Sequence, residues 1–292
     1  MAHIQDDRGQ SYAITYDSWA EMLARAETTP DVSSAHSRTN AATMQWDLDA
    51  GWDGAVQFAR AGWPDGATKA RAQYDALWGR LSALIDVQEA RHTHVPERWG
   101  ILDIGAFCAG EPEHWLEFDE VRHAGEGTCY VKLAINVAAS AGVAGPVMAA
   151  RAVAIAALVD ALELVGVRIE VTVMDVTHHG DVIASHGVIV KQYDTLLDLD
   201  RLVFAAGHPA MLRRIGFALM EQYPAWVRSK IGIGETFSGY GSPCDLAPNA
   251  QAAYDIYLKE MHAGDATWGS VDATLAWLRT TLEAQGVVFR DP

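Results

Sequence analysis

The chain contains little cysteine and no paired cysteine motif. Its three cysteines among 292 residues, Cys108, Cys129 and Cys244, form no CxxC pair. This excludes a disulfide scaffold or zinc ribbon and favours a reducing compartment. The first ten residues have neither the basic nor the apolar region of a secretion signal, and charged residues interrupt the longest apolar stretch, 148–165. We therefore expect a cytoplasmic protein with no membrane contact.

Basic residues are also scarce. The 22 lysines and arginines are outnumbered by 38 acidic residues, which gives a formal net charge of -16. Such a charge repels a phosphate backbone unless basic groups gather in one place. The longest basic grouping, Arg213-Arg214, is flanked by Leu212 and Ile215, and we interpret it as a solvated helix face. The composition thus predicts no direct nucleic-acid binding.

Two common signatures of enzymes are missing. The G-x-S-x-G motif of a nucleophilic serine is absent, since Ala139 and Ala141 flank Ser140. The glycines of the segment 125–127 precede a strand, whereas a dinucleotide-binding fingerprint follows one. We predict no cofactor and no assigned catalytic residue.

The best-defined part of the sequence is the stretch 128–177. Residues 129–137 are apolar and β-branched, as in a strand covered on both faces. Pro146 suits the first turn of a helix, and residues 148–165 are mostly apolar, so this helix should be buried on most of its circumference. Residues 167–176 predict a returning strand, parallel to the first through a right-handed crossover. A Rossmann-like α/β core follows from this pattern.

The rest of the chain predicts further elements around this core. In the first third, Ser18 and Glu21 form a capping box for a helix to about Ala26. Seven of the ten tryptophans precede residue 116, so this third holds either an aromatic core of its own or a contact surface. The other predicted elements are a loop 27–45, helices 54–61 and 67–88, strands and turns over 92–120 that add to an edge of the main sheet, an antiparallel strand 186–193, helices 196–206 and 209–222, a strand 231–237, helices 249–262 and 270–285, and a strand 287–289.

This layout resembles a von Willebrand factor A-like domain over residues 128–292. The resemblance implies a mostly parallel α/β sheet flanked by helices over 128–292. The preceding sequence predicts a mainly helical, Trp-rich N-terminal extension over 1–90 and a strand-rich connector over 91–127 that packs on the core. The resemblance also implies a magnesium site with oxygen ligands at Asn136, Ala138 and Ser140, and near His208. Asn136 offers an amide instead of a carboxylate and Ala138 offers no oxygen, so the site is degenerate and no metal is predicted.

The sequence is also similar to an uncharacterised family of phage-encoded proteins. The likeness lies in the turn 62–66, in 110–115, in 138–143, and in His208-Pro209 with the following segment 212–217. It implies a phage origin and brings no activity.

Candidate functional residues are polar side chains expected at the carboxyl ends of the strands, where open α/β sheets bind ligands. These residues are Asn136, Ser140, Asp175, His178, His179, Asp194 and His208. One hypothesis joins Asp175, His178 and His179 in a metal or acid/base centre. The alternative has Asp175 and Thr177 ending a strand, with both histidines exposed in a loop, and we favour it because adjacent residues of an extended chain point to opposite faces. Two other candidates are the His92-x-His94 pair and the acidic turn at Glu111 and Glu113.

These observations favour a non-enzymatic phage protein that acts through contact with a phage or host protein. A metal-dependent hydrolase that uses the histidines and acids named above is the alternative. A structural component of the virion is a third possibility. The oligomeric state is left open.

Overall fold

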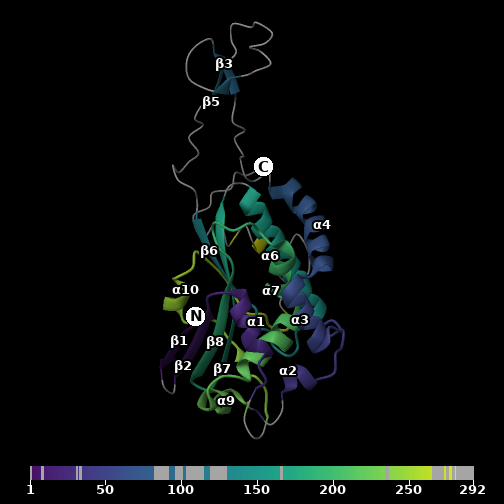
Figure 1. The fold of residues 1–292 in the computed structure, drawn as a ribbon, viewed down its shortest axis with the longest axis vertical. Helices are drawn as coiled ribbons and strands as arrows, with labels where there is room; N and C mark the ends of the chain where they lie inside the picture. Colours follow the sequence, from purple (N-terminus) through teal and green to yellow (C-terminus); the bar gives the residue numbers. More distant parts are fainter. Residues whose placement is uncertain are drawn as a thin grey trace.

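The structure, a computed structural model, centres on one mixed β-sheet with most helices on one face (Figure 1). The order of its hydrogen-bonded strands is β1 (His3–Asp7), β2 (Ser11–Tyr16), β8 (Val182–Lys191), β7 (Arg168–His179), β6 (Tyr130–Asn136) and β10 (Ile256–Leu258), and β9 (Ser242–Pro243) pairs with β7. The described residues are 2–7, 10–30, 32, 35–81, 92–95, 101–102, 115–118, 130–164, 167–233, 237–264, 273, 276–277 and 280.

The predicted central unit is confirmed. Strand β6 (Tyr130–Asn136) leads through helix α6 (Gly145–Leu164) to strand β7 (Arg168–His179), and β6 and β7 pair in parallel. Helix α6 contacts β7 on one side and α4 and α7 on others, which explains why its sequence is apolar almost all round. Strand β7 runs beyond the predicted end at Val176, because it continues into a tight hairpin at Gly180, where φ is 57°.

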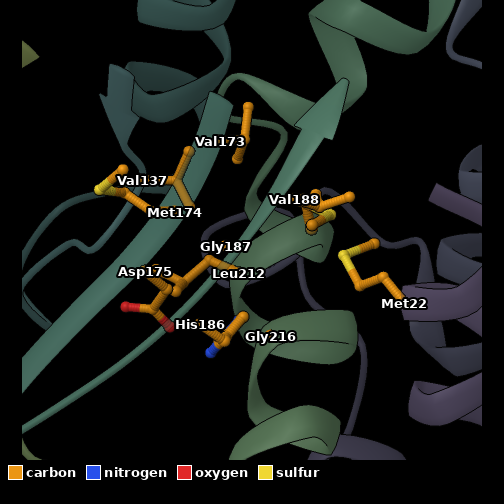
Figure 2. Close-up of a pocket in the computed structure, with 11 residues that line it drawn as sticks. Met22, Val137, Val173, Met174, Asp175, His186, Gly187, Val188, Leu212 and Gly216 are labelled. Carbon is orange, nitrogen blue, oxygen red and sulfur yellow. The ribbon is translucent and has the colours of Figure 1, made fainter. Parts of the chain in front are cut away.

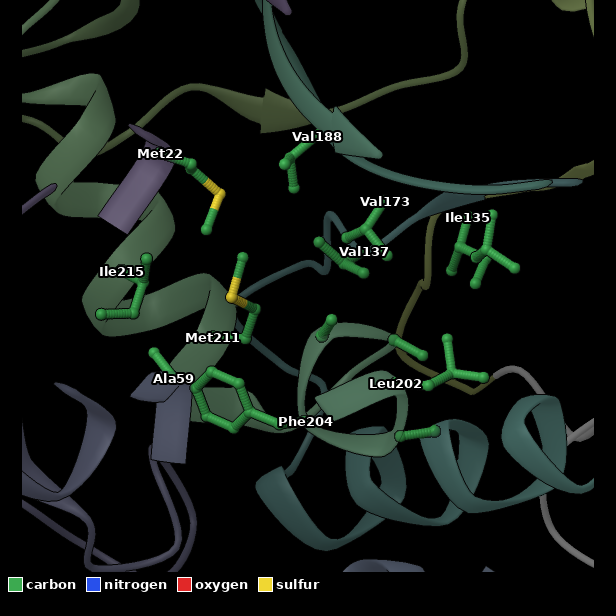
Figure 3. Packing of buried hydrophobic residues seen from close by; sticks show 14 of the residues in the cluster. Met22, Ala59, Ile135, Val137, Val173, Val188, Leu202, Phe204, Met211 and Ile215 are labelled. Atoms are coloured by element: carbon green, nitrogen blue, oxygen red, sulfur yellow. The ribbon is translucent and has the colours of Figure 1, made fainter. Parts of the chain in front are cut away.

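Strand β8 (Val182–Lys191) returns antiparallel to β7, as predicted. Side chains alternate between the two faces of the sheet along β7. Val171 and Val173 join the main core beneath the helices, whereas Met174 and Val176 belong to a second cluster on the other face. The main core fills the space between β6, β7 and β8 and the helices (Figure 3).

The N-terminal segment adds two strands that the sequence analysis missed. Strand β1 (His3–Asp7) pairs antiparallel with β2 (Ser11–Tyr16), and β2 pairs in parallel with β8. Helix α1 (Trp19–Glu27) follows, and its N-cap Ser18 accepts a hydrogen bond from the Glu21 N–H at 3.2 Å, as the capping box predicted. The start of the chain is therefore part of the central sheet instead of a helical extension.

Trp19, Trp52 and Trp63, three tryptophans of the first third, pack on the main core. Trp19 donates to the Ala59 carbonyl at 2.6 Å, and Trp63 is 7 % exposed. The helices here are α2 (His36–Thr39), α3 (Gly51–Ala61) and α4 (Pro64–Leu81). Helix α2 lies inside the segment predicted as a loop.

Four further helices of the described chain lie on the same face. Helix α7 (Leu199–Ala205) lies within the predicted 196–206, and a π-helix η1 (Met211–Gly216) continues into α8 (Phe217–Met220) within the predicted 209–222. Helix α9 (Ala225–Ile231) ends with Gly232 in the left-handed conformation. The strand predicted from Ile231 is wrong at its start, because Ile231 ends this helix.

The opposite face is covered by a thin C-terminal segment. This segment contains helix α10 (Pro248–Gln251) and places Leu246, Tyr254 and Tyr257 against Met174 and Val176. Its strands β9 (Ser242–Pro243) and β10 (Ile256–Leu258) belong to the sheet itself, because β9 pairs with β7 and β10 pairs in parallel with β6. The helix predicted over 249–262 is wrong, because residues 256–258 gain a strand partner that the local sequence does not reveal. In Figure 1, α10 lies on the opposite side of the sheet from α3, α4 and α6.

A separate antiparallel sheet contains β3 (His92–Val95), β4 (Ile101–Leu102) and β5 (Trp115–Phe118), in the order β3-β5-β4. The prediction that 92–120 adds to an edge of the main sheet is wrong, since these strands pair with one another. Outside the described residues lie the predicted boundaries at 90 and 127, Glu111 and Glu113, most of 270–285, and 287–289. No helix among the described residues has the length and apolar character to span a bilayer.

Candidate functional site

A cleft of about 340 Å³ lies at the carboxyl ends of β6 and β7, and we call it the crest cleft. Its walls come from the loop after β6, from β7, from η1 and α8, and from the segment 237–243. It therefore occupies the edge of the sheet where a ligand site was predicted. Its lining includes Asn40, Trp46, Ala138, Ala139, Asp175, Thr177, Leu212, Arg213, Phe217, Phe237, Ser238 and Tyr240.

One wall of the crest cleft is aromatic. Phe217 and Tyr240 stack with centroids 3.7 Å apart and an interplanar angle of 11°. Phe237 meets Tyr240 edge-on at 5.3 Å and is 39 % exposed. The Tyr240 hydroxyl donates to Glu221 Oε1 at 2.5 Å, so this wall is fixed from behind. Stacked rings offer a rigid apolar surface to a ligand at little entropic cost.

The segment that carries Phe237 and Tyr240 is held against β7 by a short polar contact. The Thr177 hydroxyl lies 2.9 Å from the Tyr240 carbonyl and 3.1 Å from the Ser242 carbonyl. Gly241 has φ of 78°, and a Cβ there would lie 2.2 Å from Thr177 Oγ1. Only glycine therefore allows the chain to pass this close to β7.

Asp175 lines the crest cleft and is 2 % exposed. Its Oδ2 atom has no hydrogen-bond partner among the described residues. Burial raises the pKa of this carboxyl from its ordinary value of 3.8 to about 7. The interpretation in which Asp175 and Thr177 end a strand and both following histidines lie in an exposed loop is wrong, because β7 continues to His179.

His186 is the cross-strand partner of Asp175 in the β7–β8 register. Its Nδ1 atom lies 2.7 Å from the Tyr223 hydroxyl, and burial lowers the histidine pKa to about 3. The imidazole is therefore neutral at physiological pH. Neither His186 nor Tyr223 was predicted as a site residue, although alternation along β8 puts His186 on the same face as the buried Ala184 and Val188.

A small cavity of about 10 Å³ lies between η1 and the side chains of Asp175 and His186 (Figure 2). Asp175 Oδ2 and His186 Nε2 each lie 3.5 Å from the position that a Cβ would take at Gly216. The cavity is about the size needed for one water molecule, which could hydrogen-bond both atoms. A π-helix is uncommon and recurs at functional sites, so its position beside an incompletely paired carboxylate supports a site here.

Arg213 and Arg214 are buried, so their interpretation as a solvated helix face is wrong. Arg213 donates to the carbonyls of Gln45, Trp46 and Val143 at 3.1, 2.7 and 2.7 Å. Arg214 Nη2 lies 2.6 Å from the carboxylate of Asp47. Because these contacts occupy both side chains, neither guanidinium is available to a phosphate.

Asn136, the last residue of β6, and Ser140, in the loop that follows, are also occupied by internal hydrogen bonds. The Asn136 amide donates to the Cys244 carbonyl at 2.8 Å and to the Tyr257 hydroxyl at 3.1 Å, and its oxygen accepts from the Ala138 N–H. Ser140 Oγ accepts from the Ala263 N–H at 3.2 Å. The Asn136 position requires a donor, which a carboxylate cannot supply. Asn136 and Ser140 therefore do not provide the carboxylate oxygen ligands that a magnesium ion needs.

The other four candidates do not meet at this site. His178 and His179 occupy the last two positions of β7, next to its hairpin with β8. Asp194 follows β8, and because β8 is antiparallel it lies at the opposite end of the sheet, where neighbouring Tyr193 contacts Tyr130 at 5.2 Å. His208 lines a different pocket. No group of three histidine, cysteine or acidic side chains in the described part of the chain could hold a metal ion.

One comparison with known proteins identifies a related family. A family described as a domain of unknown function, DUF7192, matches residues 4–288. No curated protein and no solved structure matches the chain.

Proposed function

The chain belongs to the DUF7192 family of unknown function, and we propose that it acts by binding a protein partner and not by catalysis. The observation that supports this proposal is the crest cleft. Its lining combines an aromatic wall with the buried, incompletely paired Asp175. We propose that the cleft accepts a lysine or arginine side chain of the partner. The cation would pair with Asp175, and its aliphatic part would pack against Phe217 and Tyr240.

Charge and geometry support this partner chemistry. The formal net charge of -16 attracts a basic partner and accelerates its association. Arg213 also lines the cleft, but its guanidinium is held by three backbone carbonyls. A buried carboxylate with a missing partner gains more from an incoming cation than an exposed one does.

The finer fold assignment is part of the same proposal. The arrangement of β6, α6, β7, antiparallel β8 and parallel β10 supports a von Willebrand factor A-like core. In this assignment the family's magnesium-bridged contact is replaced by a direct one, since Asn136 and Ser140 serve internal hydrogen bonds. The similarity to phage-encoded proteins supports a phage or host protein as the partner, in the host cytoplasm or in the virion.

The proposal is tested by selecting ligands from a displayed random-peptide library at low ionic strength. We expect enrichment of a lysine or arginine next to an aromatic or aliphatic residue. Binding of a selected peptide should weaken at least about tenfold in Asp175→Asn, which keeps the side-chain shape and removes the charge. It should also weaken by about tenfold per pH unit below about 7, where Asp175 becomes protonated.

The matched control is Asp181→Asn, which removes the same charge from an exposed turn beside the same strand. It should leave peptide affinity within about twofold, since exposed charges contribute little. Equal binding by wild type and Asp175→Asn, or enrichment of acidic peptides, would contradict the proposed role of the cleft.

A further inference from the structure

A second pocket of about 780 Å³ lies between α4 and α6, with the segment 44–48 and α3 at its ends. Its apolar lining includes Met44, Leu48, Phe58 and Trp63. The volume lies in the range typical of small-molecule sites, which combine apolar walls with a few directed polar groups. None of its lining residues is shared with the crest cleft.

The directed polar group is His208, which is 1 % exposed and lines this pocket. Its ring lies 4.6 Å from the Trp63 ring, edge-on, and 5.2 Å from the Phe58 ring. Nδ1 accepts a hydrogen bond from the Ala210 N–H at 3.1 Å, so the neutral ring carries its proton on Nε2. Within the described chain no acceptor is found for this Nε2–H, and an aromatic-lined site thus holds an unused donor.

Two charged residues of α4 complete the pocket. Lys69 is exposed, and its Nζ lies 5.9 Å from the centroid of the Trp63 ring. Asp65, also exposed, precedes it by one turn. His208 and Lys69 both line the pocket and both lie beside the Trp63 ring, so the lining carries two hydrogen-bond donors. These donors favour an anionic ligand group, whereas the acidic residue of the lining, Asp65, is exposed to solvent.

Backbone strain supports a built site. Leu48, which lines the pocket, has φ of 57°, and Asp49 has φ of 60°. Left-handed backbone is unfavourable for a residue with a Cβ and persists where the surroundings demand it. Here the buried Asp47 carboxylate, which accepts from the N–H groups of Thr43 and Gly51, holds the turn closed.

We infer that this pocket binds an apolar carboxylic acid. The hydrocarbon or aromatic body lies against Trp63, Phe58 and Met44, and the carboxylate accepts a hydrogen bond from His208 Nε2 near the charge of Lys69. This inference does not depend on the crest cleft, because the two sites share no residue.

The test uses three twelve-carbon probes on the full chain, with calorimetry as the readout. Dodecanoate should bind at least about tenfold more tightly than dodecanol or dodecylammonium, since only the carboxylate satisfies both donors. Lys69→Gln should weaken dodecanoate binding about threefold to tenfold, while Lys230→Gln, on an exposed position of α9, should leave it unchanged.

His208→Phe should remove the preference for the carboxylate over the alcohol. Because this buried change can impair folding, Ala150→Trp provides a second variant that fills the pocket from a half-buried wall position. It should reduce dodecanoate binding at least about tenfold and leave basic-peptide binding intact. Equal binding of the three probes, no binding of dodecanoate at about 1 mM, or unchanged binding by Ala150→Trp would each overturn the inference.

Discussion

Helix η1 contacts two groups of buried charged residues that differ in how completely they are paired. Arg214 donates to Asp47 and to the Ser37 carbonyl, and Asp47 also accepts two backbone N–H groups. Asp175, which faces Gly216 of η1, retains an oxygen with no partner among the described residues. The group formed by Arg214, Asp47 and the Ser37 carbonyl joins the segment 36–51 to the helical layer. Burial of charge alone therefore does not indicate a functional site, whereas incomplete pairing beside a cleft does.

The largest expected effect comes from breaking the paired group. Arg214→Met should lower the free energy of unfolding by about 3–5 kcal/mol, because Asp47 is left buried and charged without its partner. Urea denaturation measures this change. Arg201→Met removes an arginine from the exposed pair with Asp198 and should cost less than about 1 kcal/mol. Similar losses in the two variants would mean that the Arg214 pair is not a major structural contact.

Substitution of the incompletely paired Asp175 should change the free energy of unfolding in the opposite direction to Arg214→Met. The pKa of Asp175 is raised in the folded state, so its contribution to stability is fully present below about pH 3.8 and is lost as the pH rises through about 7. The difference of about 3 pKa units corresponds to about 4 kcal/mol. Asp175→Asn should remove this penalty and raise the free energy of unfolding by about 2–4 kcal/mol near pH 9, with little change near pH 4.

The measurement is urea denaturation of wild type and Asp175→Asn across this pH range, with the exposed Asp181→Asn as the matched control. The control should differ from wild type by less than about 0.5 kcal/mol at every pH. A destabilised Asp175→Asn variant at high pH would show that the carboxylate is satisfied in the folded protein, and Asp175 would then belong with the structural group.

The smallest effect concerns Asn136, the last residue of β6. Asn136→Asp introduces the carboxylate that a magnesium site would need, but it sets that carboxylate against the Cys244 carbonyl in place of a donor. We expect a loss of about 1–3 kcal/mol and no gain in magnesium binding. Magnesium, compared with EDTA at matched ionic strength, should shift the wild-type melting temperature by less than about 1 °C, whereas a bound ion would shift it by several degrees.

The control for this test is His179→Ala, an exposed change at the end of β7, which should stay within about 0.5 kcal/mol of wild type. A magnesium-dependent rise of several degrees that disappears in Ser140→Ala would contradict the assignment of Asn136 and Ser140 to internal hydrogen bonds. It would favour the metal-bridged contact instead.

Local sequence patterns were sufficient for the elements whose partners lie nearby in the chain. The β6-α6-β7 unit follows from a continuous apolar strand, a helix that is apolar almost all round, and a crossover with one allowed hand. The start of α1 follows from a cap and the residue three positions later. Such signals depend on neighbours within one or two turns, so the sequence by itself determines them.

Tertiary structure alone decided the features that depend on distant partners. The weakly apolar β2 is a strand because β8 offers it an edge, and residues 256–258 form β10 because β6 does. Arg213 and Arg214 could be buried because the carbonyls and the carboxylate of a segment about 170 residues earlier receive them. Asp175 and His186 face each other through the register of β7 and β8. Hydrogen-bond partners across the chain therefore decide whether a polar residue is solvated, structural or left available to a ligand, and no local pattern encodes that choice.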